Sequence, residues 1–216
     1  CMNFGLDRSE PMRDEKQKQG IIHNQEVQGL LDKGVHESTT VFEELPIIHT
    51  GCDTYASIYP EFKHLNKRAS VDEVVEHLLS LTPNGKWMQD NGQDVHLIMT
   101  GGEPLLAWQR LYIELFEHPR MQDLKNVTFE TNTTQKLHDD FFNYLTDQER
   151  FTVTWSCSPK LSVSGESWED AIKPNVASEY NLVDGSDLYF KFVVADRTDI
   201  DEAGKAVDEY RAAGIE

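Results

Sequence analysis

Residues Val95–Pro104 read VHLIMTGGEP, and this segment predicts the architecture of the rest of the chain. Val95–Met99 is a short apolar run, typical of a strand buried inside a sheet. The glycines of Thr100–Pro104 allow a tight turn, and Pro104 suits the first turn of a helix, where a missing N–H costs nothing. That helix would carry an apolar stripe made of Leu105, Trp108, Leu111, Leu115 and Phe116. The segment therefore predicts the strand, turn and helix of one βα unit.

The same alternation extends to both sides of this unit. Upstream, Ser70 and Glu73 form a capping box at the start of a helix that ends near Leu81. Downstream, we expect strands at 127–130, 151–156 and 188–194, and helical segments at 136–145, 167–172 and 200–213. Strands that alternate with helices at this spacing form parallel, right-handed crossovers. Because four strands are too few to close an eight-stranded barrel, the sequence predicts an α/β fold with an open, partial barrel of mostly parallel strands.

Three polar turns follow the predicted strands, and parallel sheets bind ligands at the carboxyl ends of their strands. In Thr100–Pro104, the start of the next helix can take an anionic group while Glu103 accepts from a cation, which suits a zwitterionic amino acid. The turns Glu130–Thr134 and Ser156–Lys160 add small polar side chains and a lysine. Each turn alone also has a common structural explanation. In chain order, these are a glycine turn that leads into a helix, a helix cap and a solvated lysine. Together the three turns favour one composite site.

The composition narrows the class of protein. The 216 residues include 38 acidic and 20 basic side chains, which gives a net charge of −18. Nucleic acids and anionic membranes are bound by clustered lysines and arginines, so this charge argues against both partners. No uncharged apolar run approaches the roughly 18 residues that a membrane helix needs. The three cysteines are too few for a disulfide scaffold. We therefore expect a soluble, intracellular protein of the cytoplasm.

Five short motifs, in their order along the chain, resemble radical S-adenosylmethionine (radical SAM) enzymes of the 7-carboxy-7-deazaguanine synthase family. Thr100–Pro104 is similar to the glycine-rich motif with which radical SAM enzymes bind the methionine end of their cofactor. The other motifs are Cys52-Asp53-Thr54, Glu130-Thr131-Asn132, Ser158-Pro159-Lys160 and Lys191-Phe192-Val193-Val194. The resemblance covers residues 51–216, and the ordered combination is far more specific than any single motif.

The resemblance implies a 4Fe-4S cluster bound by the three cysteines of a CxxxCxxC loop, the last of which is followed by Asp-Thr. Cys52 matches that third ligand, but no CxxC precedes it in this chain. We expect Cys1 to be the second ligand, the first to lie upstream, and residues 1–50 to form an irregular insertion within the cluster-binding loop. The chain would then be a fragment lacking both termini, with a partial-barrel core at 51–216 that is truncated at its C-terminus. The alternative is a degenerate loop that binds no cluster.

The resemblance also implies an activity and its site residues. The family converts 6-carboxy-5,6,7,8-tetrahydropterin to 7-carboxy-7-deazaguanine with loss of ammonia, a lyase reaction of 7-deazaguanine (queuosine-type) biosynthesis. By this resemblance Thr54 binds Mg²⁺, and Thr100 and Glu130 bind the pterin. S-adenosyl-L-methionine would be bound by Gly101, Gly102, Glu103, Asn132, Ser158 and Lys160. The implied partners are the pterin and an electron donor such as flavodoxin or ferredoxin, without direct contact to nucleic acid or a membrane, and family members are often homodimers.

The sequence leaves two alternative functions open. One is a radical SAM activase of a glycyl-radical protein, although such an activase is not expected to combine Cys-Asp-Thr with Ser-Pro-Lys. The other is a non-catalytic α/β binding module that has lost its cluster. Colour separates this module from an enzyme, because a thiolate-bound iron-sulfur cluster turns anaerobically purified protein brown.

Overall fold

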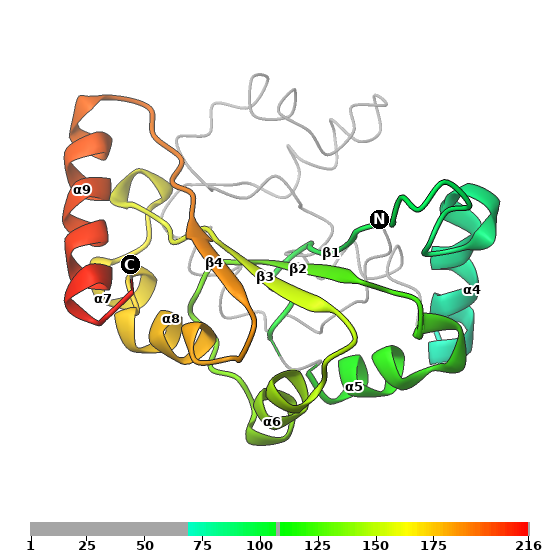
Figure 1. Cartoon of the computed structure of the whole chain (residues 1–216). Helices are drawn as coiled ribbons and strands as arrows, with labels where there is room; N and C mark the ends of the chain where they lie inside the picture. The colour runs from blue at the N-terminus through cyan, green and yellow to red at the C-terminus, as the bar shows by residue number, and fades with distance from the viewer. Residues whose placement is uncertain (1–68, 107–108, 216) are drawn as a thin grey trace. The chain divides into compact units, whose positions relative to one another are not determined.

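The computed structural model describes residues 69–106 and 109–215 (Figure 1). The chain divides into two compact units, one made of residues 1–68 with 163–165 and the other of residues 69–162 with 166–216. The second unit contains the predicted sheet and is described here by itself. The expected insertion at 1–50 and its boundary with the core at residue 51 lie outside the described residues.

Four parallel strands form the sheet of this unit, in the order β1-β2-β3-β4. Their bounds are β1 Leu97–Met99, β2 Asn126–Thr131, β3 Thr152–Cys157 and β4 Asp187–Phe190. Neighbours in the sheet are also neighbours in the sequence, and each parallel connection contains helical segments, as right-handed crossovers require (Figure 1). The predicted α/β class with a parallel sheet is therefore confirmed.

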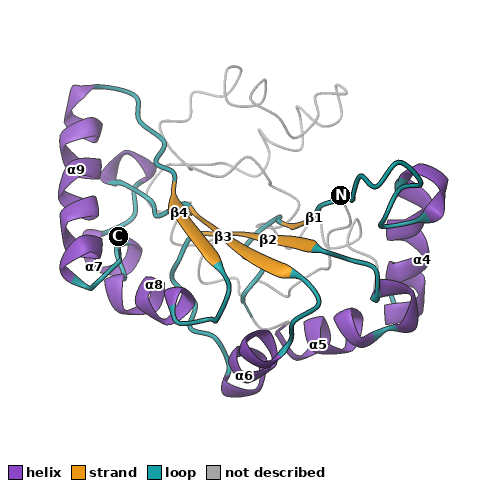
Figure 2. Ribbon diagram, in the orientation of Figure 1, coloured by secondary structure: helices purple, strands orange, loops and turns teal. Residues whose placement is uncertain are grey.

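The helices of this unit pack against one face of the sheet. Their bounds are α4 Val71–Leu81, α5 Gln109–Glu117, α6 Asp139–Asp147, α7 Trp168–Ala171, α8 Pro174–Asn181 and α9 Arg197–Ala212, with 3-10 turns at Pro83–Gly85 and Pro119–Met121. A further 3-10 turn, Ser162–Ser164, begins at the last residue of this unit before 163–165. Figure 2 shows α5, α6 and α8 following one another along the same side of the strands. Within the described ranges, no helix combines the length and the apolar character needed to cross a membrane.

Local capping explains where the first and last of these helices begin. At α4, the Ser70 hydroxyl accepts from the Glu73 N–H at 3.3 Å, and the Glu73 carboxylate accepts from the Ser70 N–H at 2.8 Å. This is the capping box that the sequence predicts, and α4 also ends at the predicted Leu81. At α9, Asp196 and Asp199 form a second box of the same kind.

Aromatic side chains fill the space between the sheet and its helices. Phe129, fully buried on β2, lies 5.2 Å from the ring of Trp155 on β3 and 6.5 Å from Phe116 on α5. Trp155 in turn stacks on Tyr180 of α8 at 4.7 Å. Because successive strand residues alternate between the two faces, Glu130, which follows Phe129 in β2, points to the opposite face, the open face of the sheet, which these helices do not cover.

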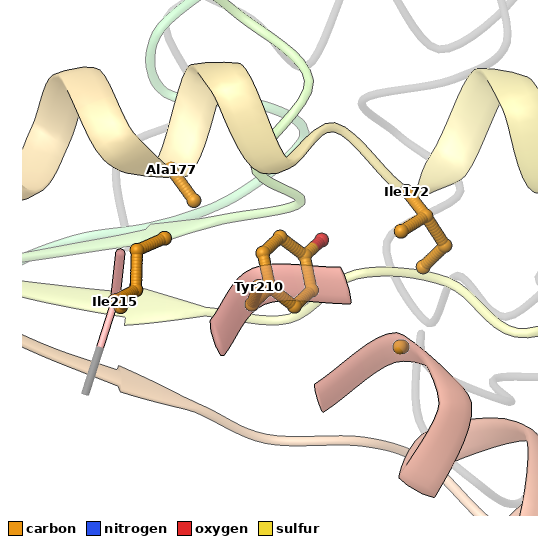
Figure 3. Packing of buried hydrophobic residues seen from close by; sticks show 5 residues of the cluster. Ile172, Ala177, Tyr210 and Ile215 are labelled. Atoms are coloured by element: carbon orange, nitrogen blue, oxygen red, sulfur yellow. The ribbon is translucent and has the colours of Figure 1, made fainter. Parts of the chain in front are cut away.

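A second apolar cluster packs α9 against the end of the sheet. Its buried members are Ile172, Ala177, Ala206, Tyr210 and Ile215, four of which are labelled in Figure 3. The Tyr210 ring stacks on Phe190, the last residue of β4, with 4.1 Å between the ring centroids. Cys157 is fully buried in β3, as the sequence predicts. This packing anchors β4 directly before Lys191.

The structure corrects the lengths of several predicted elements. Strand β1 begins at Leu97 rather than Val95, because the Val95 N–H donates to the Trp87 carbonyl at 2.7 Å. Strand β4 ends at Phe190 rather than Val194: the Lys191 N–H makes the last bond to β3, and Pro159 has no N–H to continue the ladder. The expected helix at 136–145 is shifted to 139–147, that at 200–213 to 197–212, and the helix at 174–181 was not predicted.

Candidate functional site

The three polar turns singled out in the sequence lie at one edge of the sheet, as predicted. Thr100 directly follows β1, Asn132 follows β2 and Ser158 follows β3, and all three strands run in the same direction. The Ser158 N–H donates to the Thr131 carbonyl at 2.7 Å, which joins the second and third turns. Carboxyl strand ends of this kind are the usual ligand-binding edge of a parallel sheet.

The first turn needs its two glycines. Gly101 has φ 87° and Gly102 has φ 56°, so both lie in the left-handed region, which a residue with a Cβ rarely adopts. Two consecutive residues in this region turn the chain sharply away from β1. The backbone can then approach a ligand without an intervening side chain, as the sequence predicts for the methionine end of a cofactor.

Glu103 connects the first turn to the second. It is only 5% exposed, and its Oε1 accepts from the Leu105 N–H at 3.1 Å and from the Thr131 hydroxyl at 2.8 Å. Its Oε2 accepts from the Asn132 N–H at 2.7 Å. The carboxylate therefore joins the loop after β1 to the end of β2. In this structure it stabilises the edge of the site from within the protein.

These bonds also correct the predicted start of the next helix. Pro104 and Leu105 lie in a turn, not in the first turn of a helix, and the described part of α5 begins at Gln109. The reason is that Glu103 takes the Leu105 N–H with its side chain while its carbonyl accepts from Leu106 at 3.2 Å. The Leu105 N–H is consequently not available to an anionic ligand.

The second turn is stabilised by its own side chains. Asn132 Oδ1 accepts from both the N–H and the hydroxyl of Thr134, at 3.0 and 2.7 Å. Thr133 is fully buried with φ 66°. The alternative explanation, in which this turn only caps the following helix, does not apply, because α6 begins at Asp139 and the Asn132 side chain closes a local turn.

Glu130 lies at the centre of the open face, between two donors. Its Oε2 accepts from the Thr100 hydroxyl at 3.0 Å, and its Oε1 accepts from Lys191 Nζ at 2.8 Å. The hydrogen bond from Lys191 holds the pKa of the Glu130 carboxyl below its ordinary value, with a smaller contribution from Thr100. The structure thus brings together the two residues predicted to bind substrate and adds Lys191.

Lys191 and Ser156 are the residues of this edge that the sequence analysis left without a role. The alternation of side chains along a strand could have placed both residues on the open face. It could not have given their distances to residues of other strands. Ser156 is fully buried and lies opposite Glu130 in the register of β2 and β3. Within the part of the chain that the structure describes, its hydroxyl has no hydrogen-bond partner. Among the residues that the structure describes, no hydrogen bond or ion pair links the side chains of Ser158 or Lys160 to the other predicted site residues.

The predicted metal ligands Cys1, Cys52 and Thr54 lie outside the described residues. Within 69–106 and 109–215, no group of three His, Cys, Asp or Glu side chains is arranged to bind a metal ion. Cys157 does not fit a ligand role, because burial raises the pKa of its thiol to about 12 and so disfavours the thiolate that binds iron. The donors and acceptors described at this edge suit a polar organic ligand.

A polar hollow of about 460 Å³ lies at the opposite, amino edge of the sheet. Its lining includes Lys125, Asp147 and Arg150. The Arg150 guanidinium is already bonded to the Phe116 carbonyl and to Glu117, so its charge serves the packing of α5. We therefore place the candidate site at the carboxyl edge, where ligands of parallel sheets bind.

Comparisons with known proteins do not identify a ligand for this edge, so its assignment rests on its own residues. No protein-family model matches the chain, and no curated protein or solved structure matches it either. The edge itself combines a glycine turn for close backbone approach with a carboxylate acceptor and an ammonium donor. Such a set can bind and orient a small, polar, planar molecule.

Proposed function

We propose that this chain is a radical SAM enzyme of the 7-carboxy-7-deazaguanine synthase type, which acts on 6-carboxy-5,6,7,8-tetrahydropterin. The observation that carries the proposal is the junction of the Thr100–Pro104 and Glu130–Asn132 motifs through buried Glu103. Two motifs that are both predicted to bind S-adenosylmethionine are thus joined at one edge of the sheet. The four parallel strands would belong to the partial barrel of this enzyme class.

The proposed roles follow the positions of the residues along this edge. Gly101 and Gly102 would bind the methionine end of S-adenosylmethionine through their backbone, together with Glu103, whose carboxylate also holds that turn in place. Asn132, Ser158 and Lys160 would line the rest of the cofactor. When bound and reduced, the cluster and S-adenosylmethionine would supply a 5′-deoxyadenosyl radical for hydrogen abstraction.

The substrate would lie against the open face of the sheet. Thr100 and Glu130 would bind the pterin ring, and Mg²⁺ at Thr54 would bind its carboxylate, a ligand type that this cation prefers. The chain's part in the reaction is to orient the pterin and exclude water, because the cofactor carries the radical chemistry. Thr54→Val, or removal of Mg²⁺, is expected to lower turnover.

Anaerobic reconstitution of the full-length protein with iron and sulfide tests the cluster. We expect a brown protein with the electron paramagnetic resonance signal of a reduced 4Fe-4S cluster, and its loss in Cys52→Ala and Cys1→Ala. Cys157→Ala is the matched control, since the buried Cys157 thiol is expected to bind no iron. A protein that stays colourless after reconstitution would support the non-catalytic binding module instead.

Activity assays separate the remaining outcomes. With S-adenosylmethionine, a reductant and the tetrahydropterin, mass spectrometry should detect 7-carboxy-7-deazaguanine. Cleavage of S-adenosylmethionine without conversion of the pterin would retain the radical SAM class and reject the substrate. Such a result would favour the activase alternative, which a glycyl-radical partner protein can test directly.

A further inference from the structure

Glu130 is held from both sides by strands that are distant in sequence. Thr100 at the end of β1 bonds one carboxylate oxygen, and Lys191 after β4 bonds the other. The main-chain N–H of Lys191 is itself fixed, because it donates to the Cys157 carbonyl at 2.8 Å. The orientation of the Glu130 carboxylate is therefore set by β1 and β4, although Glu130 belongs to β2.

The carboxylate keeps acceptor capacity toward the open face. A carboxylate has about four lone-pair sites, and the two described bonds occupy one site on each oxygen. The Glu130 side chain is 37% exposed and the Lys191 side chain 43% exposed, so the pair is not sealed inside the protein. Each oxygen can therefore accept one more N–H, and two such bonds in parallel suit a planar ligand edge with two neighbouring N–H groups.

Neighbouring residues on the same face favour a ligand at this place. Buried Ser156, directly opposite Glu130 in the strand register, has a hydroxyl without a hydrogen-bond partner among the described residues. Tyr189 lies opposite Ser156 on the other side and is 49% exposed. An unused hydroxyl and an exposed aromatic ring flank the carboxylate, and they offer a polar contact and a stacking surface to a flat heterocycle.

We infer that Lys191 is a positioning residue that, together with Thr100, orients the Glu130 carboxylate to bind the two N–H groups of a 2-aminopyrimidin-4-one edge. Identification of that edge with the pterin substrate rests on the proposed function. The positioning itself rests on the described bonds. Lys191 acts through Glu130, so its removal should alter how binding depends on pH and leave the chemistry of the bound substrate unchanged.

The charges around Glu130 determine the sign of the pH effect. The carboxyl accepts two N–H groups only when ionised, so binding is lost as the pH falls through its pKa, which Lys191 keeps low. Among the described residues of β1, β2 and β4 and their flanks, the other titratable groups on this face are His96 before β1, and Asp187 and Tyr189 on β4. Described residues 154, 156 and 158 of β3 and its turn are Thr and Ser and carry no charge. Lys191→Met should therefore move the acid limb of binding to higher pH.

The test measures binding to the full chain between pH 4 and 8 with two probes, 6-carboxypterin and isocytosine, which share this edge. For Lys191→Met we expect about tenfold weaker binding at pH 7, the loss typical of one hydrogen bond to a charged group, and an acid limb at higher pH. Lys191→Arg should restore both properties. Lys125→Met makes the same change of charge at the amino edge of the sheet and should change neither.

The outcomes distinguish this inference from the proposed function. Wild-type affinity and an unchanged acid limb in Lys191→Met would overturn the inference, even if 6-carboxypterin binds and is the substrate. A different result is that isocytosine binds with a pH profile that depends on Lys191 while 6-carboxypterin binds no more tightly than isocytosine. This result would support the inference and reject a pterin as the substrate. If neither probe binds to the wild-type protein, the inference is overturned. The titration of each probe is common to all variants, so differences between variants belong to the protein.

Discussion

Glu103 and Glu130 show how the position of a residue determines its role. Glu103 follows β1, and Glu130 lies near the end of the neighbouring strand β2. Both carboxylates accept a hydrogen bond from a threonine hydroxyl. Glu103 is buried and bonded to main-chain N–H groups, so it stabilises the turns. Glu130 is partly exposed and bonded to an ammonium group, so it remains accessible to a ligand. The same type of side chain thus stabilises the turns in one place and is partly exposed on the sheet in the other.

Replacement of Glu103 by Gln tests its supporting role. The glutamine amide has one acceptor oxygen, whereas the carboxylate has two. Its NH₂ group would face donors that bond to the Glu103 carboxylate in the wild-type protein, for example the Asn132 N–H. We expect the free energy of unfolding in urea to fall by about 1–3 kcal/mol, the cost of a buried donor left unsatisfied.

Glu114→Gln is the matched control for this prediction, since Glu114 is exposed on α5. It should leave the urea midpoint nearly unchanged. Equal midpoints for Glu103→Gln and the wild-type protein would contradict the supporting role of Glu103.

At the scale of the element, helix α9 determines where the chain goes after β4. Asp196 caps the helix by accepting from the Thr198 and Asp199 N–H groups at 2.7 and 3.2 Å. Asp199, which is buried, accepts in return from the Ala195 N–H at 2.7 Å. These bonds fix the segment between the helix and Lys191. The capping of a helix therefore contributes to the geometry of the site.

Asp196→Ala is expected to destabilise the protein by about 0.5–2 kcal/mol, because two N–H groups at the start of α9 lose their acceptor. Thermal unfolding followed by circular dichroism measures the loss. Asp208→Ala removes the same charge from an exposed position within α9 and should cost less. A loss of the same size in both variants would attribute the effect to charge and not to capping.

At the scale of the whole described unit, the sheet has two different faces. One packs aromatic rings against α5, α6 and α8, and the other carries the polar side chains of the candidate site. Each strand contributes to both faces because its side chains alternate. The core and the site therefore depend on one strand register, and a slip by one residue would exchange them.

Phe129→Ala tests how much of the stability lies on the helix-covered face. Phe129 is fully buried between β3 and the helices, so its truncation leaves a cavity and should cost about 3–5 kcal/mol in urea unfolding. If the alanine variant does not fold, Phe129→Leu should show a smaller loss in the same direction. Tyr189→Ala truncates a half-exposed ring on the open face and should cost much less. A larger loss in Tyr189→Ala than in Phe129→Ala would contradict this division of the faces.

The amino-acid sequence is sufficient to predict the parallel α/β class, the capping box of α4 and the position of the three polar turns. These features depend on residue periodicity, short-range hydrogen bonds and backbone preferences, which act between residues close in the chain. The burial of Glu103, the turn at Leu105 and the bond between Lys191 and Glu130 are seen only in the folded chain. Lys191 and Glu130 are 61 positions apart, and only the register of β2, β3 and β4 brings their side chains together. Their pairing is a property of the assembled sheet, because no local pattern specifies which strand ends meet.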